Sequence, residues 1–232
     1  MYLRTIAANV FLITTCFMSQ SNAAIQAQAS RVIYDASAKA ATLSLKNNAD
    51  KPYMVQSWLE AGKTTNGDTK VPFVVTPPLV KIEPQKESTL RFIYSGTGLA
   101  TDRESQFWIN IQEIPPKPEE ENILQLAVRT KIKLFYRPKQ VNVQLEDAIK
   151  KVRWSVQGNS LKLENNSPLF ITIGDLRLGS QTGPITQMQV DMVAPYESIT
   201  VLSNLPANTK TIAYTYLNEY GGNIEMPPVQ LD

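Results

Sequence analysis

The sequence predicts an all-β protein made of two immunoglobulin-like β-sandwich domains. Three observations indicate this class. Apolar residues recur in short alternating runs, these runs are rich in β-branched and aromatic residues, and 15 prolines are spread along the 232 residues. Turn residues separate the runs as they do in sandwich domains, and a chain of this length suits two domains of ordinary size.

The first half of the chain contains the strands expected for the first sandwich. We expect them at residues 29–34, 41–47, 53–60, 73–76, 89–94, 107–113 and 123–136. The sequence Thr76-Pro77-Pro78 must interrupt this series, because proline has no amide hydrogen to donate to a strand ladder. It is also a candidate for a cis peptide bond.

The second half shows the same kind of pattern after a hinge expected at Arg137-Pro138-Lys139. We expect strands at residues 152–156, 160–165, 170–178, 188–193, 198–202 and 210–217, with a short helical turn at 146–150. The hinge divides the chain into domains at residues 24–138 and 139–232.

The first 23 residues have the pattern of a signal peptide. Arg4 supplies a basic start, residues 6–18 are apolar, and Ser21 and Ala23 are the small residues of a cleavage site after Ala23. The apolar run is shorter than the roughly 20 residues of a membrane-spanning helix. The sequence therefore predicts export and removal of residues 1–23.

The composition excludes several kinds of active site. The sequence has no histidine, and its one cysteine, Cys16, lies in the predicted signal peptide. A mature chain of this composition contains no Ser-His-Asp or Cys-His site and no ordinary zinc or copper site. A formal net charge of +2 argues against a surface built for nucleic acid. We therefore expect no enzyme activity, metal or cofactor.

The run at residues 123–136 is unusually long for one strand. Leu124, Leu126 and Val128 alternate with polar residues, and the alternation continues to the end of the run. From Ile132 onward we expect an ordinary core strand. A charged, proline-rich loop at 115–122 precedes the run, so its first part is expected at an edge, where alternating apolar residues favour pairing with another chain.

Four stretches resemble one family, the PapD-like periplasmic chaperones of the chaperone–usher pathway of pilus assembly. They are SRVIYD at residues 30–35, PYMVQSWLE at 52–60, DRESQFWIN with EIPP at 102–116, and TKIKLFYRP at 130–138. The resemblance covers nearly the whole mature chain. It implies a periplasmic protein with its two domains in an L or boomerang and a cleft between them.

The family also implies a binding site for pilin (fimbrial) subunits. Arg31 and Lys133 would lie in the cleft and bind the C-terminal carboxylate of the subunit. Leu124, Leu126 and Val128 would enter the open groove of the subunit as its missing strand, which is donor-strand complementation. The subunit would then pass to an outer-membrane usher, without nucleotide or cofactor. The sequence leaves open whether the free protein self-associates.

Three further charges match family positions. Glu104, Arg137 and Glu219 resemble an ionic network that holds the two domains at a fixed angle. Glu219 stands where some relatives carry aspartate, so the geometry of the network is expected to differ in detail. The short loop before residue 123 resembles the branch of the family that assembles rod-like or multi-subunit adhesive pili.

Two alternatives stay open at this point. A secreted two-sandwich binding or adhesion module would share the composition and the fold, but it would not need the pair Arg31 and Lys133. A carboxylate-only glycoside hydrolase could use Asp102 and Glu104, or residues 119–121, as its acids. The sequence shows no aromatic sugar-binding site beside either group.

Overall fold

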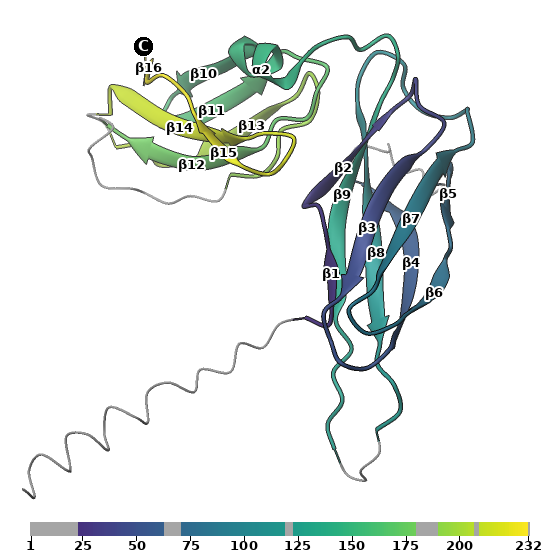
Figure 1. The fold of residues 1–232 in the computed structure, drawn as a ribbon. Coiled ribbons are helices and arrows are strands. Elements are labelled where there is room, and N and C mark those ends of the chain that lie inside the picture. The colour runs from purple at the N-terminus through teal and green to yellow at the C-terminus, as the bar shows by residue number, and fades with distance from the viewer. Residues whose placement is uncertain (1–22, 63–70, 119–122, 180–189, 207–208, 232) are drawn as a thin grey trace, which may run out of the picture.

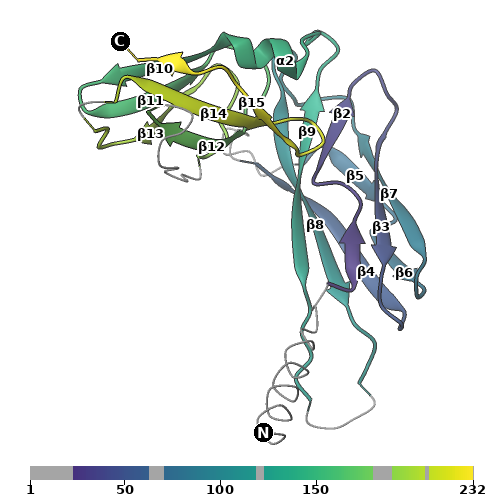
Figure 2. The ribbon, with the colours of Figure 1, turned by 60° about the vertical axis from the view of Figure 1, so that its left-hand side comes forward.

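The computed structural model describes residues 23–62, 71–118, 123–179, 190–206 and 209–231. The chain forms two β-sandwiches that together have the shape of an L (Figures 1 and 2). The prediction of an all-β protein with two immunoglobulin-like domains in this arrangement is confirmed. The predicted signal peptide lies outside the described residues except for Ala23. Within the described part of the chain, no helix has the length and apolar character needed to span a membrane.

The described residues of the first sandwich form nine strands. They are β1 (Ile25–Ala27), β2 (Arg31–Asp35), β3 (Ala41–Asn47), β4 (Tyr53–Ala61), β5 (Phe73–Thr76), β6 (Leu79–Ile82), β7 (Glu87–Tyr94), β8 (Ser105–Ile114) and β9 (Arg129–Arg137). One sheet has the order β1-β3-β7-β5 and the other the order β2-β9-β8-β4-β6. The prolines after Thr76 separate β5 from β6, and the Thr76–Pro77 bond is cis.

The second sandwich begins with a short helical segment and continues as strands. The elements are α2 (Leu145–Ala148), the 3-10 turn η1 (Ile149–Lys151), β10 (Val152–Gln157), β11 (Ser160–Asn165), β12 (Ile173–Leu178), β13 (Ser198–Leu202), β14 (Thr211–Leu217), β15 (Asn223–Glu225) and β16 (Val229–Gln230). One sheet has the order β10-β11-β13, and in the other β14 pairs with β12, β15 and β16.

Each sandwich has its own core, because alternate residues of its strands point inward. In the first, Leu45, Phe92, Phe107 and Leu134 are completely buried. A separate core fills the second sandwich, and Val141 and Leu145 at its start belong to it. A third, smaller cluster joins the domains and consists of Phe135, Phe170 and Ala194, with Ile33 and Met192 packed against it.

The structure corrects several predicted strands. The run at 170–178 begins as a strand only at Ile173, and the described part of 188–193 makes a single bridge between Val193 and Ile171. β1, β6, β15 and β16 were not predicted, because two to four residues are too few to show an alternation. The largest correction concerns the run at 123–136: β9 starts at Arg129, and residues 123–128 are not in a strand.

The chain changes sheets between its first two strands. β1 pairs antiparallel with β3 in one sheet, whereas β2 pairs parallel with β9 in the other. The pairing of β2 with β9 starts at Arg31 and Lys133, so the earlier part of β9 has β8 as its only strand neighbour among the described residues. This crossing leaves one edge of β9 open before Lys133.

Candidate functional site

Residues 123–128 carry the most exposed row of apolar side chains next to a strand in the molecule's described part. Leu124 is 87% exposed and Leu126 is 74% exposed, and Val128 lies at the boundary with β9. In both views the described residues before β9 project from the end of the first domain, far from the second domain (Figures 1 and 2). Apolar side chains in this position contribute favourable burial free energy only when a partner covers them.

The alternation of these residues is in phase with the core side of β9. Ile132 and Leu134, at the same parity, are buried in the first sandwich. The backbone links the exposed row to the sheet at one point, where the Glu113 amide donates to the Val128 carbonyl oxygen at 2.9 Å. The predicted core character of the strand from Ile132 onward is confirmed.

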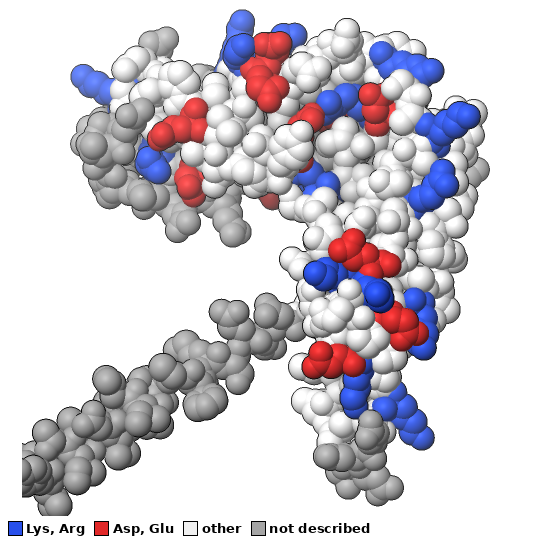
Figure 3. Space-filling view, in the orientation of Figure 1, with Lys and Arg blue, Asp and Glu red and all other residues white. Residues whose placement is uncertain are grey.

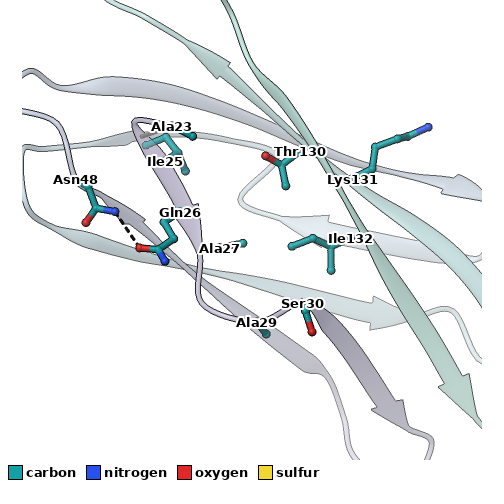
Figure 4. Close-up of a pocket in the computed structure, with 10 residues that line it drawn as sticks. All are labelled: Ala23, Ile25, Gln26, Ala27, Ala29, Ser30, Asn48, Thr130, Lys131 and Ile132. Atoms are coloured by element: carbon teal, nitrogen blue, oxygen red, sulfur yellow. Dashed lines mark hydrogen bonds between the residues drawn. The ribbon is translucent and has the colours of Figure 1, made fainter. Parts of the chain in front are cut away.

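A hollow lies beside the open edge of β9, where the chain crosses from β1 to β2 (Figure 4). Its volume is about 690 Å³. Thr130, Lys131 and Ile132 line one side, and the other side is lined by Ile25, Gln26, Ala27, Ala29 and Ser30. The hollow has room for an additional extended segment next to β9. It continues the line of the exposed row toward Lys133.

Arg31 and Lys133 stand side by side where β2 and β9 begin to pair. They are register partners on these two parallel strands, so their side chains share one face of the sheet. Both are partly buried. The Lys133 ammonium lies 5.6 Å from the centre of the Trp108 ring. Two cations therefore meet at the end of the open edge.

The environment of Arg31 favours an incoming anion. Its Nε is buried and makes no hydrogen bond with the described residues. Burial lowers the pKa of Arg31, while the carboxylates of Glu219 and Glu104 oppose that shift. A guanidinium remains charged in proteins, so the unused donor is a strong one for a carboxylate.

The structure brings Glu104, Arg137 and Glu219 together between the domains. Arg137 Nε donates to Glu104 Oε1 at 2.9 Å, and its terminal nitrogen donates to Glu219 Oε1 at 2.7 Å. The other oxygen of Glu104 accepts the amide hydrogen of Phe170 at 2.8 Å. Although burial opposes the charge on Arg137, the two carboxylates raise its pKa.

Neutral contacts reinforce this junction. The rings of Phe135 and Phe170 lie 5.4 Å apart, and the Glu104 amide donates to the Pro168 carbonyl at 2.9 Å. On the side of Arg31, the Ser30 hydroxyl lies 3.4 Å from the Tyr220 carbonyl oxygen that accepts its hydrogen. Sequence reasoning missed Phe170, because one aromatic residue at the start of an expected strand carries no sign of a domain contact.

The residues considered as hydrolase acids are engaged elsewhere. Asp102 is exposed and pairs with Arg103 beside it, and Glu104 is held by Arg137 and Phe170. Residues 119–121 lie outside the described part. No cluster of metal-ligating side chains occurs among the described residues. Acidic and basic side chains are intermixed on the face shown in Figure 3, which gives no broad basic surface there.

Comparisons with protein families cover both domains. Residues 24–142 match the family model described as "Pili and flagellar-assembly chaperone, PapD N-terminal domain". Residues 147–227 match "Pili assembly chaperone PapD, C-terminal domain". The "Probable fimbrial chaperone YadV" of Escherichia coli (strain K12) is 35% identical over 244 residues, which cover 97% of this chain and 98% of the relative.

Solved structures show the same similarity. The chain resembles the Salmonella enterica SafB chaperone in its complex with the SafA pilin, with a TM-score of 0.75 and 32% identity over 90% of this chain and 96% of that one. The periplasmic chaperone SfaE matches with a TM-score of 0.70 and 31% identity over 89% and 98%. With both domains matched along almost their whole length, the chain belongs to the PapD family of pilus-assembly chaperones.

Proposed function

We propose that this protein is a periplasmic chaperone that binds, folds and caps pilin subunits by donor-strand complementation. The observation that carries the proposal is the exposed row Leu124, Leu126 and Val128, which leads along an open strand edge to the paired cations Arg31 and Lys133. The similar SafB chaperone was solved in complex with a pilin, which supports the same class of partner here.

The exposed row supplies the apolar side chains that an incomplete sandwich lacks. A subunit whose core is open along one groove receives Leu124, Leu126 and Val128 as a strand. Burial of one such side chain is worth about 1.5–3 kcal/mol, so three contribute about 5–9 kcal/mol before the cost of ordering the segment. Because residues 123–128 pair with no strand among the described residues, their amides and carbonyls are available for the subunit, except for the Val128 carbonyl, which is bonded to Glu113.

The two cations set the register of this pairing. A carboxylate at the end of the subunit accepts hydrogen bonds from Arg31 and Lys133, and charge-assisted bonds of this kind are strong and directional. A shift by one residue would present Gln125 and Ala127 to the apolar groove in place of the leucines. The distance from Leu124 to Lys133 is about 30 Å for an extended chain, enough for a strand of about nine residues.

Several further assignments belong to the same proposal. The domain boundary lies between Pro138 and Lys139, because Val141 already packs in the second core. The ionic network of Glu104, Arg137 and Glu219 holds the domains at a fixed angle. Residues 1–23 are removed as a signal peptide on export, the loaded subunit passes to an outer-membrane usher, and the protein catalyses no reaction.

The binding of a pilin C-terminus tests the proposal directly. The pilin is first identified by co-purification from periplasm. We expect the protein to bind a peptide that carries the last strand of this pilin with a free C-terminal carboxylate. The same peptide with a C-terminal amide should bind about tenfold or more weakly, because it lacks the negative charge that Arg31 and Lys133 would bind. Isothermal titration of the two peptides measures this difference. Equal affinity for the two peptides would contradict the proposed binding of the carboxylate by Arg31 and Lys133.

Capture of a whole subunit separates this function from the alternative of an adhesion module. A chaperone keeps a refolding pilin subunit soluble as a one-to-one complex on size exclusion, whereas an adhesion module leaves it to aggregate. A protein that binds the native, completed pilus but does not rescue the single subunit would favour the adhesion module.

A further inference from the structure

A buried carboxylate stands at the end of β8 without a cation among the described residues. Glu113 is 4% exposed and lies in phase with the core residues Phe107, Ile109 and Ile111 of the same strand. Burial of a carboxylate is costly unless hydrogen bonds and an opposite charge compensate for the lost water. The position of Glu113 therefore requires an explanation that the pilin-binding site does not give.

The groups that contact this carboxylate come from the start of the mature chain. The amide of Ile25 donates to Glu113 Oε1 at 3.1 Å, and the neighbouring amide of Ala24 lies near enough to the carboxyl group to favour its charged form. Burial raises the pKa of Glu113, and these two amides oppose the shift. Among the described residues, no lysine or arginine takes part. The carboxylate thus faces the backbone nitrogens at the start of β1, that of Ile25 and that of Ala24 before it.

Ala24 is also the residue that follows the predicted cleavage site. Hydrolysis of the Ala23–Ala24 bond by a signal peptidase adds the hydroxyl of water to the Ala23 carbonyl carbon and a hydrogen to the Ala24 nitrogen. The amine then takes up a proton, since an α-amino group has a pKa of about 8. Cleavage therefore places a positive charge on the atom beside Glu113.

We propose that Glu113 is the binding site for the α-ammonium group that cleavage creates at Ala24, so that signal-peptide removal completes a buried ion pair. The inference rests on the cleavage proposed above and adds to it the position of the cut. A chain that starts one residue later would lose the nitrogen of Ala24, and a chain that starts earlier would keep it as an uncharged amide.

The surrounding contacts hold Ala24 in place for this pair. Its carbonyl oxygen accepts the amide hydrogen of Asn48 at 2.8 Å, and the next residue, Ile25, is the register partner of Asn47 on β3. Glu113 also donates its own amide to Val128, where the exposed row joins the domain. One residue thus connects the new N-terminus to the base of the client-binding segment.

The first part of the test determines where the mature chain begins. Mass spectrometry of the protein purified from periplasm should show Ala24 as its first residue. A different first residue would overturn the assignment of Glu113. This result does not depend on pilin binding. A different first residue would contradict the role of Glu113 but not the chaperone function. Failure to capture pilin would contradict the chaperone function but not the ion pair.

The second part measures the coupling between the N-terminus and Glu113. Four proteins are unfolded in urea: the chain starting at Ala24 and the chain retaining Ala23, each with and without Glu113→Gln, which keeps an acceptor but removes the charge. Retention of Ala23 should shift the unfolding equilibrium about tenfold or more toward the unfolded state in the parent and less than about twofold in the Glu113→Gln variant. Equal shifts in both backgrounds would overturn the pair. Glu87→Gln, at an exposed carboxylate on β7, is the matched control.

A third measurement applies to the unaltered mature protein and does not depend on how a variant folds. The rate of acylation of the α-amine by an activated ester, followed against pH, gives the pKa of that amine. We expect it to lie at least about one unit above that of an unfolded peptide with the same first residues. An α-amine with the pKa of the free peptide would overturn the proposal.

Discussion

The two parts of one alternating run, residues 123–128 and β9, have the same pattern and opposite environments. In β9, Leu134 is completely buried between neighbouring strands, and β8 and β2 both hydrogen-bond to its part of the backbone. In the earlier part, Leu126 is 74% exposed and lies in no strand. The difference comes from the neighbours, because the first strand crosses to the other sheet and gives the earlier part no partner.

This comparison teaches that alternation specifies a face but not a partner. A row of alternating apolar side chains needs an apolar surface to pack against. The first sandwich provides that surface for β9 but not for residues 123–128. We therefore propose the exposed part as the region where a second chain completes the structure. The following predictions test this difference between the two parts.

The largest expected effect is that of Leu134→Glu. The glutamate would bury an unpaired charge in the core of the first sandwich, so we expect a loss of more than about 4 kcal/mol in the free energy of unfolding and little folded protein. Leu126→Glu places the same side chain in water and should change that free energy by less than about 1 kcal/mol. Urea unfolding measures the free energy of unfolding of both variants. Equal losses would mean that residues 123–128 belong to the core of the domain.

The same Leu126→Glu variant should lose its client. A charge cannot enter an apolar groove without loss of water, so we expect the affinity for a pilin subunit to fall by about 100-fold or more. Gln125→Glu is the matched control, since residue 125 has the opposite parity and its side chain contacts the Pro116 carbonyl at 2.7 Å. Subunit capture followed by size exclusion compares the two. Normal capture of the subunit by the Leu126→Glu variant would contradict the role of residues 123–128 as the donated strand.

The cation pair should have a smaller effect on binding and almost none on folding. Arg31→Ala and Lys133→Ala each remove a charge-assisted hydrogen bond, so we expect capture to weaken by about 10- to 100-fold. Lys81→Ala is the control, because Lys81 lies on β6 at the opposite edge of the same sheet and pairs with Glu83 at 2.7 Å. Equal capture of the subunit by all three variants in a pull-down would mean that the subunit binds at another site.

The smallest expected effect concerns the junction of β9 with the second domain. Glu219→Ala removes one partner of Arg137 while Glu104 remains, and the side chain of Glu219 is 33% exposed. We expect a stability loss below about 1 kcal/mol. Small-angle X-ray scattering should show a broader distribution of shapes than for the parent. An unchanged profile would mean that the aromatic contact of Phe135 with Phe170 sets the angle by itself.

Sequence reasoning located several strands well, misplaced the start of the longest one, and did not address how the strands pair. The expected ranges at 41–47 and 160–165 coincide with β3 and β11, because each has a full alternation bounded by turn residues. β1 was missed, since in three residues only Ile25 is buried. The start of β9 was placed at residue 123 instead of Arg129, because a single sequence does not show where the neighbouring strands stop.

The candidate site was predicted in part from the family resemblance. The structure brings Arg31 to Lys133 and Arg137 to both glutamates, and their roles stay predictions. Glu113 escaped notice although a signal was present, since it falls in phase with the inward residues of its strand. A carboxylate at such a position indicates a specific partner, and the partner here is the backbone at the beginning of the mature chain.

The parallel pairing of β2 with β9 has a consequence for the order in which the protein is made. Arg31 and Lys133 come from the second and the last strands of one sandwich, and Ser30 contacts Tyr220, 190 positions further along the chain. Contacts between such distant residues form late in folding. If the chain is exported with its N-terminal end first, Arg31 and Lys133 come together only after more than half of the 232 residues have crossed. A chain that has crossed only as far as β8 would therefore lack the paired cations that we propose as the site for the subunit.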